Sequence, residues 1–261
     1  MSSSSYVTEK RVVGGFDSIQ LRGSGRVSLR QTGTESVEVR APRRCLSRIE
    51  TRVENGTLIL GFKRGIFPVF SLSLHDRDDI EFSISADVIQ GLAISGSGSV
   101  ETDELDVGDF RIGVSGSGRV SSRAINAKDL HVSISGSGKV LSERLHADDI
   151  EIRSSGSGKV SLGDVSAKTL HSTISGAGNI QAMGSVGDAD VRISGSGSLS
   201  LEQLVTDRFK ARISGSGKIR VHARESLESS ISGSGSILYR GTPQVNVRTN
   251  GSGKIRRIDE A

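Results

Sequence analysis

The segment Ile134-Ser135-Gly136-Ser137-Gly138-Lys139-Val140 decides the fold, because the chain repeats it with small changes along most of its length. Its first glycine recurs at intervals of 20 residues four times, and then of 19, 20, 18 and 18 residues. An isolated copy, Gly23-Ser24-Gly25, lies near the N-terminus. A fixed period in this range indicates a fold built by stacking similar units on one another.

One unit, residues 130–149, shows what each repeat contains. Leu130, Val132 and Ile134 alternate with polar residues, which is the period-two pattern of a half-buried strand. After the Ser-Gly-Ser-Gly tract, Val140 begins a second apolar series that continues at Leu145. Each unit therefore predicts one clear strand, a glycine corner, a second short strand and a polar return segment.

The short period excludes the common helical repeats. A strand–helix–strand crossover needs roughly 30 residues or more, and the leucine-rich frame with its asparagine is absent. The sequence therefore predicts an all-β fold, a single-stranded right-handed parallel β-helix (a solenoid) with coils of 18–20 residues. The right hand is expected because parallel crossovers nearly always have it.

Stacking predicts which side chains are buried. Equivalent residues of successive coils should lie about 4.8 Å apart, so that Ile112–Val132–Ile152 and Val114–Ile134 become buried apolar rows. Ser154 follows Ile134 in its row and is expected to be a polar break in it.

The paired glycines are predicted to form the structural corner of each coil. A tight turn between two strands needs a positive φ, which glycine adopts without steric cost. The serines between them form either a ligand-binding row or part of a simple chain reversal. The corner glycines are Gly96, Gly98, Gly116, Gly118, Gly136, Gly138, Gly156, Gly158, Gly176, Gly178, Gly195, Gly197, Gly215, Gly217, Gly233, Gly235, Gly251 and Gly253.

The chain divides into three parts that form one continuous domain. Residues 1–10 are predicted to be a disordered tail, 11–91 an irregular β section or cap, and 92–261 the regular coils. Within the cap, Asn55-Gly56 predicts a hairpin over 49–62. Two further strands are expected at 70–74 and 80–84, and terminal units of a solenoid are commonly atypical.

Composition excludes several classes of protein. The net charge is +4 and aromatic residues make up 3% of the chain, so the basic face with stacking aromatics that is typical of nucleic-acid binders is not expected. Cys45 is the one cysteine, so no internal disulfide forms. No apolar run is long enough to span a membrane, and the start, Met1-Ser2-Ser3-Ser4-Ser5, lacks an apolar signal region.

Four motifs together resemble a bacterial family, the putative auto-transporter adhesin head GIN domain. They are Val13-Gly14-Gly15-Phe16-Asp17-Ser18-Ile19, Glu54-Asn55-Gly56-Thr57-Leu58, the serial Ile-Ser-Gly-Ser-Gly units, and Tyr239-Arg240-Gly241-Thr242-Pro243 followed by Gly251-Ser252-Gly253. The resemblance covers roughly residues 11–258. It implies a β-helical fold and export to the cell envelope, and it brings no catalytic residues.

Three outward rows are candidate sites. Arg119, Lys139 and Lys159 form a basic row just after the corners, which either supplies the base of an enzyme that cleaves acidic polysaccharide or opposes edge pairing, the commoner use of such lysines. A row with Arg111, His131, Glu151, His171 and Asp190 is better explained as a solvated charge row than as a metal site, since zinc ligands must lie near 2 Å from the ion. In the return segment, Gly108, Lys128, Asp148, Lys168 and Asp188 are expected to form a row whose charges alternate.

The sequence leaves more than one function open. One hypothesis is a non-enzymatic, adhesin-like envelope or surface module that binds glycan or protein on an outer face. The alternative is a structural or self-associating scaffold without a ligand, and a remote third is a polysaccharide-active enzyme. No catalytic residue, cofactor or metal is expected. Serine stands in the corners where calcium-binding rolls carry carboxylates.

Overall fold

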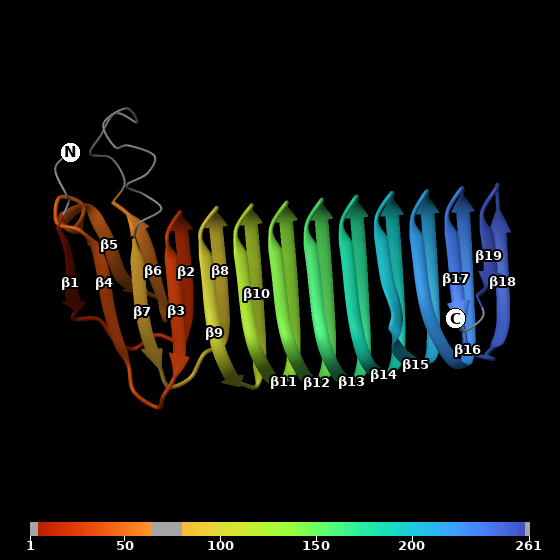
Figure 1. Ribbon diagram of the computed structural model, residues 1–261, viewed down its shortest axis with the longest axis horizontal. Helices are drawn as coiled ribbons and strands as arrows, with labels where there is room; N and C mark the ends of the chain where they lie inside the picture. Colours follow the sequence, from red (N-terminus) through yellow and green to blue (C-terminus); the bar gives the residue numbers. More distant parts are fainter. Residues whose placement is uncertain (1–4, 64–79, 259–261) are drawn as a thin grey trace.

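The computed structural model describes residues 5–63 and 80–258 and shows a parallel β-solenoid (Figure 1). The strand expected at 70–74 lies outside the described residues. The strands are β1 (Tyr6–Arg11), β2 (Ser18–Gly23), β3 (Arg26–Gln31), β4 (Ser36–Pro42), β5 (Ile49–Glu54), β6 (Thr57–Phe62), β7 (Glu81–Ala86), β8 (Gly91–Gly96), β9 (Ser99–Asp106), β10 (Asp109–Gly116), β11 (Arg119–Gly136), β12 (Lys139–Gly156), β13 (Lys159–Gly176), β14 (Asn179–Gly195), β15 (Ser198–Gly215), β16 (Lys218–Gly233), β17 (Ser236–Arg240), β18 (Gln244–Asn250) and β19 (Lys254–Arg257).

Each regular coil is one long, bent strand. Strands β11 to β16 have 16 to 18 residues each, and each pairs in parallel with the next. The sequence predicted two strands separated by a polar return segment. In the structure the return segment also pairs with that of the next coil, as in the partners Asn126↔His146 and Ala127↔Ala147. Return residues stack because every coil repeats their backbone path, so a polar composition does not prevent the ladder from continuing.

The two glycines of each corner are required for different reasons. The first glycine has a positive φ, as at Gly136 (+115°), and a Cβ there would lie 2.7 Å from the carbonyl oxygen of Gly116 one coil before. The second glycine is buried, and a Cβ on Gly138 would lie 2.4 Å from Cγ1 of Val114. A side chain at the first position therefore meets backbone, and at the second position it meets the core.

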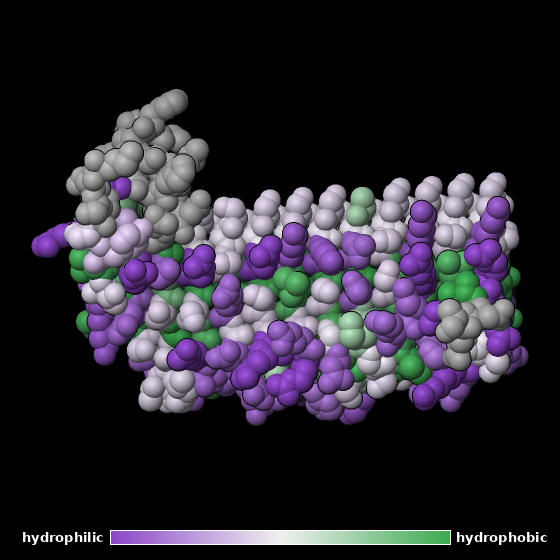
Figure 2. All heavy atoms as spheres, in the orientation of Figure 1, coloured by the Kyte–Doolittle hydropathy of each residue, from purple (hydrophilic) through white to green (hydrophobic). Residues whose placement is uncertain are grey.

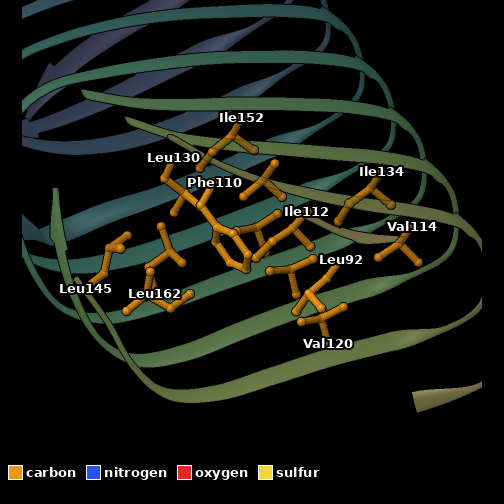
Figure 3. Close-up of a cluster of buried hydrophobic side chains, with 14 of the residues drawn as sticks. Leu92, Phe110, Ile112, Val114, Val120, Leu130, Ile134, Leu145, Ile152 and Leu162 are labelled. Carbon is orange, nitrogen blue, oxygen red and sulfur yellow. The ribbon is translucent and has the colours of Figure 1, made fainter. Parts of the chain in front are cut away.

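The predicted core rows are confirmed. Ile112, Val132 and Ile152 are partners on successive coils, as are Val114 and Ile134. The side chains of Ile112, Val114 and Ile134 point into the coil toward residues of the strand on the other side of the corner, such as Val120 (Figure 3). Ile134 is 1% exposed, so this row lies inside the coil, away from solvent.

The irregular N-terminal section follows a coil order that differs from the sequence order. Strands β2 and β3 form a true coil that stacks on β8 and β9, with Gly23-Ser24-Gly25 as its corner. On its other side, β6 and β7 stack in parallel on β2 and β3, although they come later in the chain. The predicted hairpin is confirmed, since β5 pairs antiparallel with β6 around Asn55-Gly56.

The two ends of the solenoid depart from the regular pattern. Residues 6–10 lie in the segment predicted to be a disordered tail, but β1 pairs antiparallel with β4, and Arg11 donates a hydrogen bond to the Leu46 carbonyl. Backbone pairing along β4 orders this polar strand without burying it. At the other end, Gly241-Thr242-Pro243 interrupts the last coil between β17 and β18.

We predict opposite effects for two neighbouring core substitutions. Ile134→Ala should lower the free energy of unfolding by about 2–5 kcal/mol, as core truncations do. Ser154→Val should leave it unchanged or raise it, because the Ser154 hydroxyl is buried without a hydrogen-bond partner. Ser154 lies beneath the corner residue Gly178, and Val114 lies beneath Gly138 in the same way. The fold therefore already accommodates a valine at the equivalent position of another coil. Urea denaturation measures both, and an unchanged Ile134→Ala would contradict the register.

Candidate ligand-binding surface

The basic row predicted beside the corners is in register. Arg119 is the partner of Lys139, which is the partner of Lys159. All three side chains are exposed, and none makes an ion pair or side-chain hydrogen bond with a residue that the structure describes. Along the axis, Ser99 precedes Arg119 in this row, and the neutral Asn179 and Ser198 follow Lys159. Further on, the row continues with Lys218, Ser236 and Lys254.

The corners themselves form an uncharged ridge. Serines such as Ser135 and Ser137 are exposed on successive coils, and their rows run parallel to the solenoid axis. Figure 2 shows this ridge as a pale band along the edge where the strands of Figure 1 end in arrowheads. The basic row follows it directly, because Ser117 and Arg119 are successive outward residues with buried Gly118 between them. Hydroxyls and cations thus share one continuous surface.

The face before the corner is charged as well, but it carries both signs, and several of its charges are paired. Arg111, His131, Glu151, His171 and Asp190 stack in the predicted order. The Nδ1 of His131 lies 3.0 Å from Oε2 of Glu151, which also accepts a hydrogen bond from Arg153. Within residues 5–63 and 80–258, no three His, Cys, Asp or Glu side chains come together in a way that could hold a metal ion.

The return row is confirmed in part. Lys168 Nζ lies 2.8 Å from Asp148 Oδ1, and this contact lowers the pKa of Asp148 and raises the pKa of Lys168. The placement of Asp188 in this row was wrong. Asp188 is the partner of Thr169, because the 19-residue unit lacks one residue where the register shifts between Leu162 and Val165. Its carboxylate instead pairs with Arg208 on the next coil.

A column of aspartates was not predicted. Asp109, Asp129 and Asp149 are partners on three successive coils. Partial desolvation, a hydrogen bond with Asp109 and the charges of Asp109 and Asp149 raise the pKa of Asp129, against the opposing charge of Lys128. The signal was present in the sequence as three aspartates spaced by 20 residues. The shift in the pKa of Asp129 depends on the distances to neighbouring side chains in adjacent coils, and the spacing in the sequence does not give these distances.

The surface also has shallow polar depressions. One, of about 390 Å³, lies where the N-terminal section meets the first coils. Charged residues of both signs line it, including Arg30, Glu101, Asp103, Arg123 and Glu143. Cys45 is buried in the N-terminal core, away from this depression. Serines and Thr102 line much of the rest of the depression.

These features define a β-solenoid repeat protein with an extended, repetitive outer surface, and the sequence places it in a family. The profile of the family described as putative auto-transporter adhesin, head GIN domain, matches residues 15–143 and 140–243. The chain therefore belongs to this family, as its motifs indicated. No protein of curated function matches the sequence.

Solved structures share the fold. A putative adhesin from Parabacteroides merdae is similar with a TM-score of 0.73 and 19% identity, over 97% of this chain and 96% of that one. A putative adhesin from Parabacteroides distasonis gives 0.71 and 20% over 98% of both chains. A putative lipid binding protein from the same organism gives 0.70 and 21% over 97% of both. At these identities the likeness extends to the fold alone.

We predict that the aspartate column destabilises the protein at neutral pH. A raised pKa means that the fold disfavours ionised Asp129, so this cost is present above its folded pKa and absent below the ordinary value of about 3.9. Asp129→Asn should therefore raise the melting temperature at pH 7, and the gain should vanish at low pH. Asp103→Asn removes the same charge from a place beside Arg123 and should give no gain. Equal melting of Asp129→Asn and the parent at pH 7 would contradict the prediction.

Proposed function

We propose that this chain is a non-enzymatic, adhesin-like module of the cell envelope that binds glycan or protein through an outer face of the solenoid. The observation that carries the proposal is the in-register repetition of exposed side chains over successive coils. Solenoids use such extended surfaces to bind extended partners. Membership of an adhesin family supports the same conclusion and supports an envelope location.

The structure agrees with a binding role in one further respect. The row of cations beside the serine ridge lies on strands that pair on both sides, so these side chains are held at fixed spacing by the sheet. Separately, none of the helices in the described part of the chain has the length and apolar character of a membrane span.

A self-associating scaffold is the second candidate, and the last coil favours it. Strands β18 and β19 pair with the preceding coil, and within the described residues no strand pairs with their outer edges. Val245 on β18 is 40% exposed, so the end of the stack presents an apolar residue at an open edge. Another copy could extend the sheet there, although Arg256 and Arg257 on β19 oppose such pairing by charge.

The purified chain on an array of neutral and acidic glycans, and on cell-surface protein extracts, tests the proposal. We expect saturable binding to at least one of these surfaces and no change in the length of a bound glycan on chromatography. Sedimentation of the same sample should show one species over the concentrations used. Glycan cleavage would establish an enzyme instead, and absent binding with concentration-dependent assembly would establish the scaffold.

A further inference from the structure

We propose that the row Arg119–Lys139–Lys159, together with the serines beside it, binds a linear acidic polysaccharide that lies along the solenoid axis. This inference rests on the proposed function, because it names the ligand class for one outer face. We call these three residues the basic strip. It is the place on the described surface where like charges stack without compensation on three successive coils next to an uncharged ridge.

The basic strip differs from three cationic positions elsewhere on the coils, where a carboxylate on an adjacent coil pairs with the cation. Lys168 pairs with Asp148, Arg208 with Asp188, and Lys210 with Glu228 on the coil beside each of them. Arg119, Lys139 and Lys159 have no carboxylate partner among the described residues. Like charges on neighbouring rungs repel one another. The strip therefore costs the free protein stability that a bound polyanion would restore.

Protection of a sheet edge does not account for the strip. Exposed lysines commonly prevent edge-to-edge pairing, but β11, β12 and β13 are interior rungs. Strand β12 pairs with β11 on one side and β13 on the other, and β11 and β13 likewise have partners on both sides. No free edge exists at these residues, so the cations are left to act on a partner outside the chain.

The surroundings of the strip match an acidic glycan. The cations repeat about every 4.8 Å along the axis, which is similar to the rise of one sugar in an extended polysaccharide. The outward residues on either side of Arg119 are Ser117 and Ser121, and those of Lys159 are Ser157 and Ser161. Ammonium and guanidinium groups bind carboxylate or sulfate, while serine hydroxyls can donate to and accept from sugar hydroxyls.

The same surroundings disfavour a nucleic acid. Single strands are held by aromatic side chains on which the bases stack. The outward residues beside the basic strip are serines and Leu141, and none is aromatic.

Lys218 and Lys254 continue the row beyond the neutral Asn179 and Ser198, so that a flexible polymer could contact cations again further along.

Binding of two polyanions by the intact chain tests this proposal, with polygalacturonate and dextran sulfate as probes and neutral dextran as the blank. The Arg119→Gln/Lys139→Gln/Lys159→Gln variant should bind roughly tenfold more weakly or worse, about 1.4 kcal/mol or more. The control, Arg111→Gln/Arg144→Gln/Arg248→Gln, loses the same charge from exposed cations elsewhere and should bind nearly as the parent does. Lys139→Arg/Lys159→Arg should retain binding.

The melting temperature supplies a second readout, measured separately from the binding assay. The glutamine triple should melt at or above the temperature of the parent at low salt, and each polyanion should raise the melting temperature of the parent but not of the triple. Equal loss in both triples would show a response to net charge alone and would overturn the proposal. So would equally tight binding of single-stranded DNA, or of an acidic protein, in place of the polysaccharides.

The outcomes separate this inference from the function on which it rests. Binding to neutral glycan or to protein that survives in the glutamine triple would overturn the acidic polysaccharide and leave an adhesin-like module. Absence of binding to every glycan and protein surface would overturn both. Saturable, salt-sensitive binding to the acidic probes that is lost in the glutamine triple would support both.

Discussion

The structure depends on the close approach of backbones at the glycine corners. The Ser157 amide donates to the Gly136 carbonyl at 2.9 Å, and the Ser137 amide donates to the Gly116 carbonyl at 2.8 Å. These bonds repeat from coil to coil at a point where a Cβ on the first glycine would overlap the preceding carbonyl. Because every coil turns at the same place in the same way, the strands between corners keep one register, and the aliphatic rows inside them follow from it.

The constraint at the corner also organises the outside of the molecule. Fixed register places equivalent residues side by side, so a single residue type at one repeat position becomes a row with strand spacing. The protein uses this in contrasting ways: Asp148 and Lys168 attract each other, Asp109, Asp129 and Asp149 repel one another, and three unpaired cations line the ridge. The sheet holds such rows in place whether or not they are favourable, which is why a repulsive row can persist in the folded protein.

Much of this could be predicted from the period and the alternation of residues. The parallel stack, the burial of Ile134 and the basic strip all follow from counting positions, and the hairpin follows from the turn residues Asn55-Gly56. Asp188 was misplaced because its unit is one residue shorter than the preceding ones. The position of the missing residue is known only from the strand pairing, whose register shifts between Leu162 and Val165. The coil order at the N-terminus, where β6 and β7 precede β2 and β3 in the stack, joins segments far apart in the chain, and local patterns do not encode it.

The most direct measurement of the central claim is the free energy of unfolding of three variants within one corner. Ser137→Ala should unfold like the parent, since Ala177 already occupies the equivalent place between Gly176 and Gly178. Gly136→Ala should lose at least about 1–3 kcal/mol, because alanine must adopt a strained φ against the backbone of the preceding coil. Gly138→Ala should also lose stability, by crowding Val114. If both glycine variants unfolded like the parent while Ser137→Ala did not, the corner would not be what holds the coils in register.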